Sequence, residues 1–393
     1  MEMKKYKLGE LGEVRMCKRI LKEDTNTVSG IPFFKIGTFG NVADVFITRK
    51  KFEEYKAKYS YPKKGDVLIS AAGTIGRTVV YNGEDAYFQD SNIVWIENDE
   101  SKVVNALLYY AYKNVKWKVS NGSTILRLYN DDLRRTEIFV PADISVQKKI
   151  ASILSSLDKR IENLRAQNRV LEQTAKTIYD YTFLQCAGHQ TTYNKTLNRN
   201  IPADWEVKKL KEVCKVLLGG TPNTKREDYW LNGTINWLNS GEVANFPIID
   251  CEKKITKKAV EESSTVFLPK GSVTLSITRY LRPSILAIDA CINQSVAGIL
   301  ENGILKKSYL FPMLKTEVPK LNALRSGAQQ PHINKDIVEN INVVIPPKEV
   351  LDKYYSIVDP IYEKILINSE HLKELVNQRN TLLPLLMTGQ IEV

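Results

Sequence analysis

Two long segments of the chain repeat apolar residues at steps of three and four, the pattern of helices that pack side by side. Asn168 is the polar member of the first seam, and Asn368 and Arg379 interrupt the second. Each helix alone would expose an apolar stripe, so we expect the two seams to bury each other. Packing of each helix on its own module is the alternative. The predicted interface residues are Leu154, Leu157, Ile161, Leu164, Asn168, Leu171, Ile178, Val358, Ile361, Ile365, Leu372, Leu375 and Leu382.

Two prolines fall inside the second helical pattern. Proline in a helix marks its first turn or bends it, because it lacks the backbone N–H. We expect Pro360 to lie near the start of that helix and Pro384 to bend its end. A helix over residues 150–184 would be about 52 Å long, or about one and a half turns of B-DNA.

The chain also repeats itself at an interval of about 205 residues, the kind of self-similarity that defines domain organisation. Both copies end in a proline-marked strand followed by one of the long helices. Short apolar runs predict strands at 66–70, 92–96 and 137–140, with counterparts at 272–278, 295–300 and 342–345, and a helix near 103–119. The matching segments are 8–11 with 210–213, 64–70 with 270–276, 121–123 with 326–328, 139–141 with 344–346, and 152–154 with 356–358.

These patterns predict an α/β chain in which two similar α+β modules are separated by two long antiparallel helices, with pseudo-two-fold symmetry. Residues 187–200 are polar and lack apolar periodicity, which is typical of a linker. The expected segments are a first module at 1–146, a central helix at 147–186, the linker at 187–200, a second module at 201–348 and a C-terminal helix at 349–393.

Charge and the absence of targeting signals narrow the class of protein. The chain of 393 residues holds 56 Lys and Arg against 45 Asp and Glu, for a net charge of +11. The excess lies outside residues 349–393, so a basic body favours a polyanion such as nucleic acid, with general solubility as the alternative. No apolar run approaches the roughly 20 residues of a membrane span. The N-terminus lacks an apolar signal region, and the five cysteines are scattered, so we expect a cytoplasmic protein with reduced thiols.

Catalytic chemistry is weakly represented. The segment Asp359–Tyr362 is the nearest approach to the Asn/Asp-Pro-Pro-aromatic loop of an adenine methyltransferase, but it lacks the second proline and lies in the helical seam. Glu252 and Lys254 have the spacing of a metal-dependent nuclease, a common chance match in a lysine-rich chain. The three histidines are dispersed, and no Walker-type phosphate loop occurs. We therefore expect a protein without catalytic residues or a metal site.

The chain resembles the specificity subunit of type I restriction-modification systems over nearly its whole length. The resemblance rests on the doubled order of short motifs. Those of the first half are Leu8–Leu11, Ala72–Arg77, Gln89–Ile93, Asn121–Leu128 and Asp132–Pro141, followed by the helix that opens at Gln147. The second half departs from the pattern at residues 276–283, where the Gly-Thr-Ile-Gly turn of the first half has no match.

The resemblance implies a non-catalytic reader of double-stranded DNA. Two target-recognition domains would each read half of a split site, leaving an unread gap between the halves. Two methyltransferase subunits would dock on the helices and supply S-adenosylmethionine, so this chain would need no cofactor, and motor-nuclease subunits would complete the complex. The alternatives are a methyltransferase-only or self-cutting system of related design, an unrecognised nuclease or methyltransferase, and a coiled-coil scaffold that binds protein.

Candidate DNA-reading residues follow from the side chains that contact phosphates and base edges, chiefly Arg, Lys, Asn, Gln and hydroxyls. In the first module these are Arg77, Ser123, Thr124 and Arg127. In the second module they are Arg279, Arg282, Gln329, Gln330 and His332. Lysines at 253, 254, 257 and 258 are candidates for phosphate contacts, although a lysine run is more often a solvated face.

Overall fold

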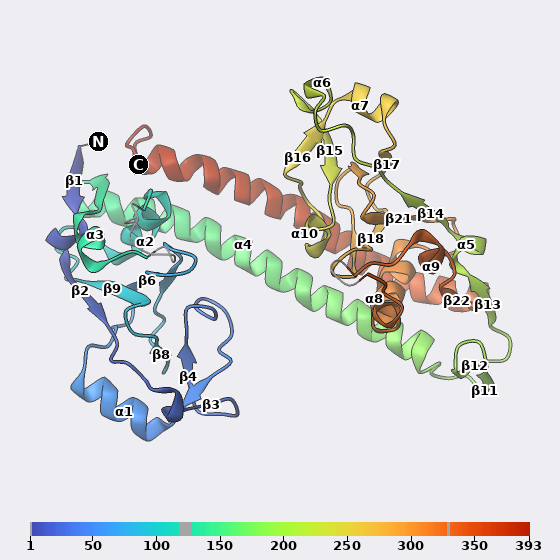
Figure 1. Cartoon of the computed structure of the whole chain (residues 1–393), viewed down its shortest axis with the longest axis horizontal. Coiled ribbons are helices and arrows are strands. Elements are labelled where there is room, and N and C mark those ends of the chain that lie inside the picture. Colours follow the sequence, from blue (N-terminus) through green and yellow to red (C-terminus); the bar gives the residue numbers. More distant parts are fainter. Residues whose placement is uncertain (1, 118–126, 328–330) are drawn as a thin grey trace. The chain divides into compact units, whose positions relative to one another are not determined.

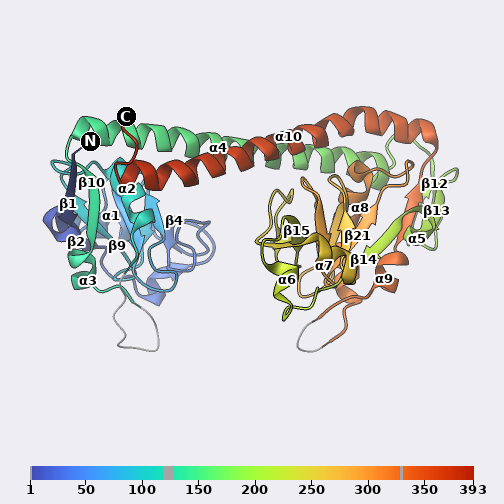
Figure 2. The ribbon, with the colours of Figure 1, turned by 90° about the horizontal axis from the view of Figure 1, so that it is seen from above.

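The computed structural model describes residues 2–117, 127–327 and 331–393, which form two compact units (Figures 1 and 2). Unit 1 comprises Met1–Lys159 and Asn377–Val393, and unit 2 comprises Arg160–Val376. The long helices α4 (Ile144–Tyr179) and α10 (Lys348–Met387) contribute residues to both units. Each unit therefore contains one of the predicted modules together with a segment of each long helix.

Unit 1 is built on antiparallel sheets of two and four strands. β1 pairs with β10, and a four-stranded sheet has the order β2-β9-β6-β7. A further sheet of short strands has the order β3-β5-β4-β8, in which β4 and β8 run parallel. The strands are β1 (Met3–Lys7), β2 (Gly12–Met16), β3 (Thr25–Asn26), β4 (Ile31–Phe34), β5 (Phe46–Ile47), β6 (Val67–Ser70), β7 (Thr78–Val80), β8 (Tyr87–Phe88), β9 (Ile93–Asn98) and β10 (Glu137–Pro141). The helices are η1 (Leu8–Glu10), η2 (Lys22–Asp24), α1 (Arg49–Lys58), α2 (Asn105–Asn114) and α3 (Asn130–Arg135).

Unit 2 repeats the main part of this architecture. β13 pairs with β22, and the four-stranded sheet has the order β14-β21-β18-β19. A second four-stranded sheet has the order β16-β15-β20-β17. The strands are β13 (Glu206–Lys209), β14 (Lys215–Leu218), β15 (Ile235–Leu238), β16 (Lys253–Ile255), β17 (Val266–Leu268), β18 (Val273–Ser276), β19 (Arg282–Ile285), β20 (Ala290–Ile292), β21 (Val296–Leu300) and β22 (Asn342–Ile345). The helices are α5 (Leu210–Val213), α6 (Glu227–Trp230), η4 (Glu242–Ala244), α7 (Lys257–Glu262), α8 (Lys307–Ala323) and α9 (Lys335–Glu339).

The predicted sequence repeat is thus a structural repeat. The first strand of each module leads into a short helix whose third residue is a glutamate. The Glu10 carboxylate accepts from the Lys7 N–H at 3.0 Å, and the Glu212 carboxylate accepts from the Lys209 N–H at 2.7 Å. Each glutamate caps an N–H group that the short helix leaves unpaired. This shared cap explains why Leu8–Leu11 has an echo at Leu210–Val213.

Several boundaries differ from those predicted. α4 begins at Ile144 rather than 147, and a π-helical turn, η3 (Asp180–Leu184), follows it. The expected linker contains a β-hairpin formed by β11 (Thr191–Asn194) and β12 (Arg199–Pro202). The expectation that Pro360 lies near a helix start was wrong, because it lies well inside α10. An interior proline removes one helical hydrogen bond, and the buried residues on either side of Pro360 outweigh that loss.

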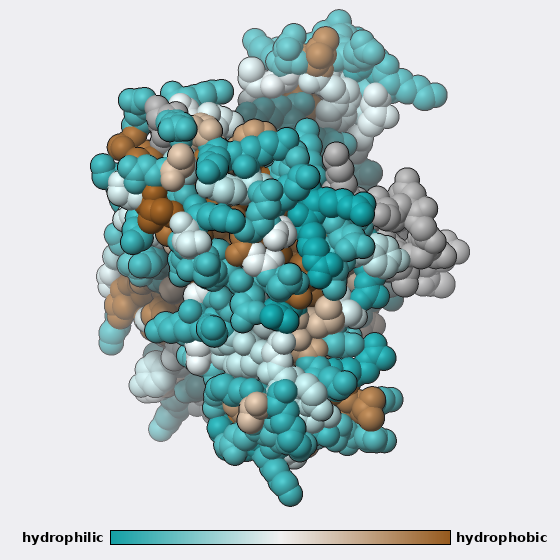
Figure 3. All heavy atoms as spheres, turned by 90° about the vertical axis from the view of Figure 1, so that its left-hand side faces the viewer, coloured by the Kyte–Doolittle hydropathy of each residue, from teal (hydrophilic) through white to brown (hydrophobic). Residues whose placement is uncertain are grey.

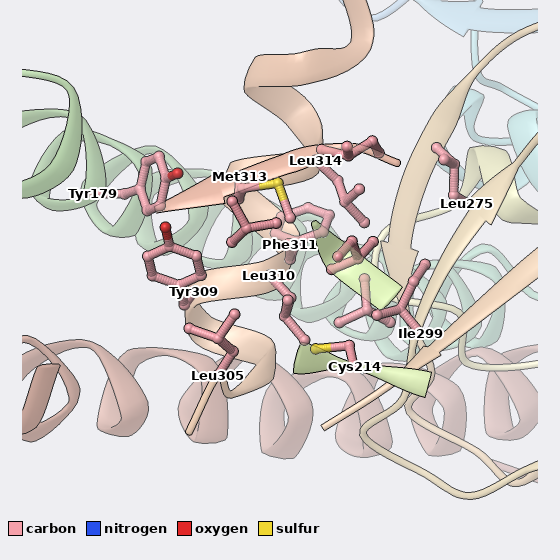
Figure 4. Packing of buried hydrophobic residues seen from close by; sticks show 14 of the residues in the cluster. Tyr179, Cys214, Leu275, Ile299, Leu305, Tyr309, Leu310, Phe311, Met313 and Leu314 are labelled. Atoms are coloured by element: carbon pink, nitrogen blue, oxygen red, sulfur yellow. The ribbon is translucent and has the colours of Figure 1, made fainter. Parts of the chain in front are cut away.

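The cores of both units include side chains from the long helices. In unit 1, Ile150 and Leu154 of α4 and Leu386 of α10 belong to the main cluster. In unit 2, Tyr179 packs edge-on against Tyr309 of α8, with ring centroids 5.5 Å apart (Figure 4). Strand residues such as Leu275 and Ile299 line the same cluster. Each long helix therefore packs on both modules, which differs from the alternative that each helix packs on its own module alone.

The helices also contact each other through polar side chains. In unit 2 the Asn368 amide donates to Asn168 Oδ1 at 3.0 Å, and the Asn168 amide donates to Ser369 Oγ at 3.1 Å. All three side chains are buried. In unit 1 the Arg379 guanidinium donates to Asp158 at 3.1 Å, and Tyr110 donates to the second oxygen of that carboxylate at 2.9 Å. Polar residues in an apolar seam favour the register that pairs them.

The predicted seam residues are all buried or half-buried in the structure. Among the helices that the structure describes, none is both long and apolar enough to cross a membrane. The surface seen in Figure 3, on the side of β1 and β2 in Figure 1, is mostly hydrophilic with hydrophobic residues in small groups.

The buried asparagine pair gives a stability prediction. Asn368→Ala leaves Asn168 Oδ1 without its donor, so we expect unfolding to become easier by about 1–3 kcal/mol. Replacing both asparagines with leucine removes both polar groups and is expected to cost less than the single change. Urea unfolding measures the difference, with the exposed Asn377→Ala on the same helix as the control. Equal stability of Asn368→Ala and Asn377→Ala would contradict the importance of this pair.

Candidate nucleic-acid interface

In unit 1 the candidate interface begins with the turn that joins β6 to β7, residues 71–77. Gly73 and Gly76 take positive φ values of 64° and 82°, which side chains disfavour. A Cβ atom at Gly76 would lie 2.3 Å from Trp117 Nε1, so a side chain there would displace the indole. The second glycine of the Gly-Thr-Ile-Gly motif is therefore needed for the packing of Trp117.

A second chain segment crosses the start of this turn, and the same crossing occurs in unit 2. In unit 1 the Leu128 N–H donates to the Ala71 carbonyl at 2.8 Å, beside a β-bridge between Ala72 and Arg127. In unit 2 the Ile333 N–H donates to the Ile277 carbonyl at 2.9 Å, beside a bridge between Thr278 and His332. Arg127 and His332 thus hold equivalent places in the two modules.

The two arginines predicted for unit 1 also have structural contacts. The Arg77 guanidinium donates to the Phe39 carbonyl at 2.9 Å, and the Arg127 guanidinium donates to the Ser91 carbonyl at 3.0 Å. Gln89 accepts from the Ile36 N–H at 2.9 Å, so residues 35–44 are tied at two points. Arg77 and Arg127 join neighbouring loops, and their remaining N–H groups are donors for a ligand.

In unit 2 the turn between β18 and β19 is the counterpart of this turn. Arg279 has a φ of 62°, close to the 64° of Gly73, and its N–H donates to the Pro331 carbonyl at 2.8 Å. The Gly-Thr-Ile-Gly sequence of the first half has no match here, and the turn at 277–281 is shorter than that at 71–77, but Arg279 takes the positive φ that Gly73 has in unit 1. Arg279, Arg282 and His332 are exposed near this turn.

Four of the predicted reading residues lie outside the part of the chain that the structure describes. Ser123 and Thr124 lie in the segment 118–126, and Gln329 and Gln330 lie in the segment 328–330, both outside the described residues. The structure therefore brings Arg77 and Arg127 together in unit 1 and Arg279, Arg282 and His332 together in unit 2. Their contact with DNA stays a prediction.

The candidate arginines differ from Lys257 and Lys258 in whether a carboxylate lies close to them. Over the described ranges, Arg77, Arg127, Arg279 and Arg282 have no carboxylate within ion-pair distance. In contrast, Lys258 pairs with Asp228 at 2.9 Å, and Lys257 lies 3.5 Å from Glu261. Hydrogen bonds from Arg226 and Lys258 hold the pKa of Asp228 well below its usual value. The arginine charge is thus available to phosphates, while part of the lysine charge is neutralised within the protein.

The remaining candidate chemistry is accounted for structurally. Asp359 accepts from Lys306 at 2.7 Å and from Ser308 at 2.5 Å, and Tyr362 is buried, so the segment Asp359–Tyr362 is a helix turn rather than a substrate loop. Burial raises the pKa of Cys17 to about 12, which keeps that thiol protonated. Within the described ranges, no three His, Cys, Asp or Glu side chains are placed to hold a metal ion.

These observations define a class of protein with two related α+β modules, each of which has, in the part of the chain that the structure describes, arginines without a carboxylate partner on corresponding loops. The family model for the type I restriction modification DNA specificity domain matches the chain twice, at residues 1–173 and 202–378. The chain belongs to this family.

Relatives with curated names agree with that assignment. A putative type I restriction enzyme specificity subunit of Haemophilus influenzae is 51% identical over 181 residues, covering 46% of this chain and 47% of that relative. The chain thus aligns with about half the length of that protein. The MjaIX specificity subunit of Methanocaldococcus jannaschii is 27% identical over 365 residues, covering 88% of this chain and 82% of that protein.

A solved structure supports the fold. The S subunit of a type I restriction-modification system from M. genitalium aligns with a TM-score of 0.62 at 15% identity, covering 98% of this chain and 96% of that one. The predicted fold class, two similar α+β modules with two long helices, is confirmed.

Sequence reasoning missed the residues that anchor the loops. Gln89 was part of a quoted motif without a role, and the Phe39 carbonyl could not be identified from a pattern. Tyr280 was also passed over, although an aromatic residue between Arg279 and Arg282 is a local signal that could have found it.

The anchoring contact predicts a change in loop dynamics. Arg77→Ala removes the donor to the Phe39 carbonyl, so amide exchange at Thr38 and Asn41, whose N–H groups bond within residues 35–41, should accelerate about tenfold. Hydrogen–deuterium exchange with mass spectrometry measures the rates. Arg282→Ala is the matched control, because its guanidinium contacts Tyr280 of its own turn. Unchanged exchange over residues 35–44 in Arg77→Ala would contradict the anchoring role.

Proposed function

We propose that this chain chooses the DNA sequence on which a type I restriction-modification complex acts. Each unit reads one half of a bipartite site in double-stranded DNA, and base pairs between the halves are left unread. Unit 1 reads through the loops around Arg77 and Arg127, and unit 2 reads through the loops around Arg279, Arg282 and His332. The chain acts in the cytoplasm.

The observation that carries this proposal is the repeated loop crossing. Both modules place a β-bridge against the turn that follows a central strand, and among the described residues the arginines at these turns have no carboxylate partner. Guanidinium groups bind phosphate oxygens and guanine edges, and two equivalent modules suit two half-sites. Membership of the DNA specificity family agrees with this use of the arginines.

The chemistry of modification and cleavage is assigned to partner subunits. We propose that two methyltransferase subunits bind the long helices and carry S-adenosylmethionine, and that motor-nuclease subunits join them for restriction. In this arrangement the present chain contributes sequence choice and no catalytic residue. The half-buried carboxylate of Asp359, held by a lysine and a serine, supports a structural role for the one segment with a methyltransferase-like sequence.

Adenine-methylation mapping by single-molecule sequencing tests the function. DNA is taken from cells that express the chain with its neighbouring methyltransferase gene, and from cells that express the methyltransferase alone. We expect a split motif with an unread gap only when the chain is present. Methylation of the same motif by the methyltransferase alone would contradict the proposal. Failure of the two proteins to form a complex would instead favour a scaffold or an independent enzyme.

Single substitutions test whether the two modules read separate halves. Arg127→Ala should lower selection of one half-site while the other half-site is read normally, because Arg127 and the Ser91 carbonyl that it binds both belong to unit 1. Arg282→Ala should have the reciprocal effect. Equal relaxation of both half-sites by either variant would show that the modules do not read separately.

A further inference from the structure

The turn between β18 and β19 presents an aromatic ring to solvent beside positive charge. Tyr280 is 61% exposed, and the guanidinium carbon of Arg282 lies 4.9 Å from the centroid of its ring. Arg279, the residue before Tyr280, is also exposed. Neither arginine has a carboxylate partner in the part of the chain that the structure describes. The stacked guanidinium restricts the positions available to the ring.

The backbone holds this turn in one conformation. The Tyr280 N–H donates to the Thr278 carbonyl at 2.7 Å, and the Arg279 N–H donates to the Pro331 carbonyl at 2.8 Å. The Arg325 guanidinium donates to the Arg279 carbonyl from a third segment. An arginine at a φ of 62° takes a conformation that favours glycine, so these bonds fix a geometry that the chain would otherwise avoid. The ring is thus displayed on a rigid support.

The same turn in unit 1 lacks the ring. Gly73 has the φ of Arg279, and the residue that follows it is Thr74, where unit 2 has Tyr280. The two turns differ in length, with seven residues between β6 and β7 and five between β18 and β19, and in the side chain that follows the residue of positive φ. Thr74 offers a hydroxyl for hydrogen bonds, whereas Tyr280 offers an aromatic face flanked by cations.

That combination suits a nucleic-acid base. In a duplex, apolar and aromatic side chains contact thymine methyl groups in the major groove or insert between base steps, and guanidinium groups bind the neighbouring phosphates. We propose that Tyr280 is a specificity-determining residue of unit 2, whose ring contacts a base of the half-site that this unit reads. The inference rests on the proposed function and adds the residue and the mode of contact.

Selection from a library of randomised DNA duplexes tests the assignment, using the full chain purified with its methyltransferase. The sequences retained by the wild-type protein define both half-sites. Tyr280→Ala should reduce the preference for the favoured base at one or two positions of one half-site by roughly 5-fold to 100-fold. The other half-site should be selected as by the wild type. Tyr280→Phe keeps the ring and should keep the preference.

Tyr181→Ala is the matched control, because Tyr181 is 60% exposed in the same unit but lies on the turn after α4. It should leave both half-sites unchanged. Selection of the wild-type motif by Tyr280→Ala would overturn the role of Tyr280 and leave the proposed function standing. Loss of preference in Tyr280→Phe equal to that in Tyr280→Ala would overturn contact through the ring. Failure of the wild-type protein to select any sequence would overturn the proposed function itself.

Discussion

Burial of the apolar faces of α4 and α10 is the constraint on which the rest of the structure depends. Each module completes its core with side chains from these helices, Ile150 and Leu154 in unit 1 and Tyr179 and Tyr354 in unit 2, where Phe183 of η3 joins them. An aromatic side chain buries a large apolar area, and Phe183 alone packs against four rings, those of Tyr179, Trp205, Tyr309 and Tyr354. A module that lost its helix segments would expose this surface, so module and helices form one folded body within each unit. The loops that carry the candidate arginines are anchored on that body.

The heptad pattern predicted that the two long helices pack on each other, but it did not show that they also pack on the modules. It identified Asn168 and Asn368 as polar interruptions, and the structure pairs them with each other. The pattern did not identify Tyr354 and Tyr362, which lie on the face that packs against the module. A helix that contacts a partner helix and a module at once carries two apolar faces, and a search for a single seam finds only one of them. The alternative of packing on the module was therefore compatible with the same sequence.

The repeat was the part of the fold that could be predicted best, and the loops were the part that could be predicted least. Strands such as Val67–Ser70 and Val273–Ser276 are short apolar runs of the kind that pattern reading detects. Strands β3 and β5 have two residues each, too few to show any periodicity in the sequence. Arg77 was chosen for its charge, but its bond to a carbonyl 38 residues away depends on tertiary structure that no local pattern contains. The sequence therefore predicted Arg77 as a candidate residue but could not predict that the Phe39 carbonyl is its hydrogen-bond partner.

The correspondence between Gly73 and Arg279 shows how sequence choice can vary on a fixed frame. In both units the turn is positioned by main-chain hydrogen bonds, from Leu128 to Ala71 and from Ile333 to Ile277, and main-chain bonds do not depend on which side chains the turn carries. The side chains that point into solvent from the turn carry few packing constraints, since they are not part of either core. A threonine can thus stand at one turn and a tyrosine at the other without a change in strand order. If the turns meet DNA as we propose, the main-chain bonds fix where a base is met and the exposed turn residues determine which base is preferred.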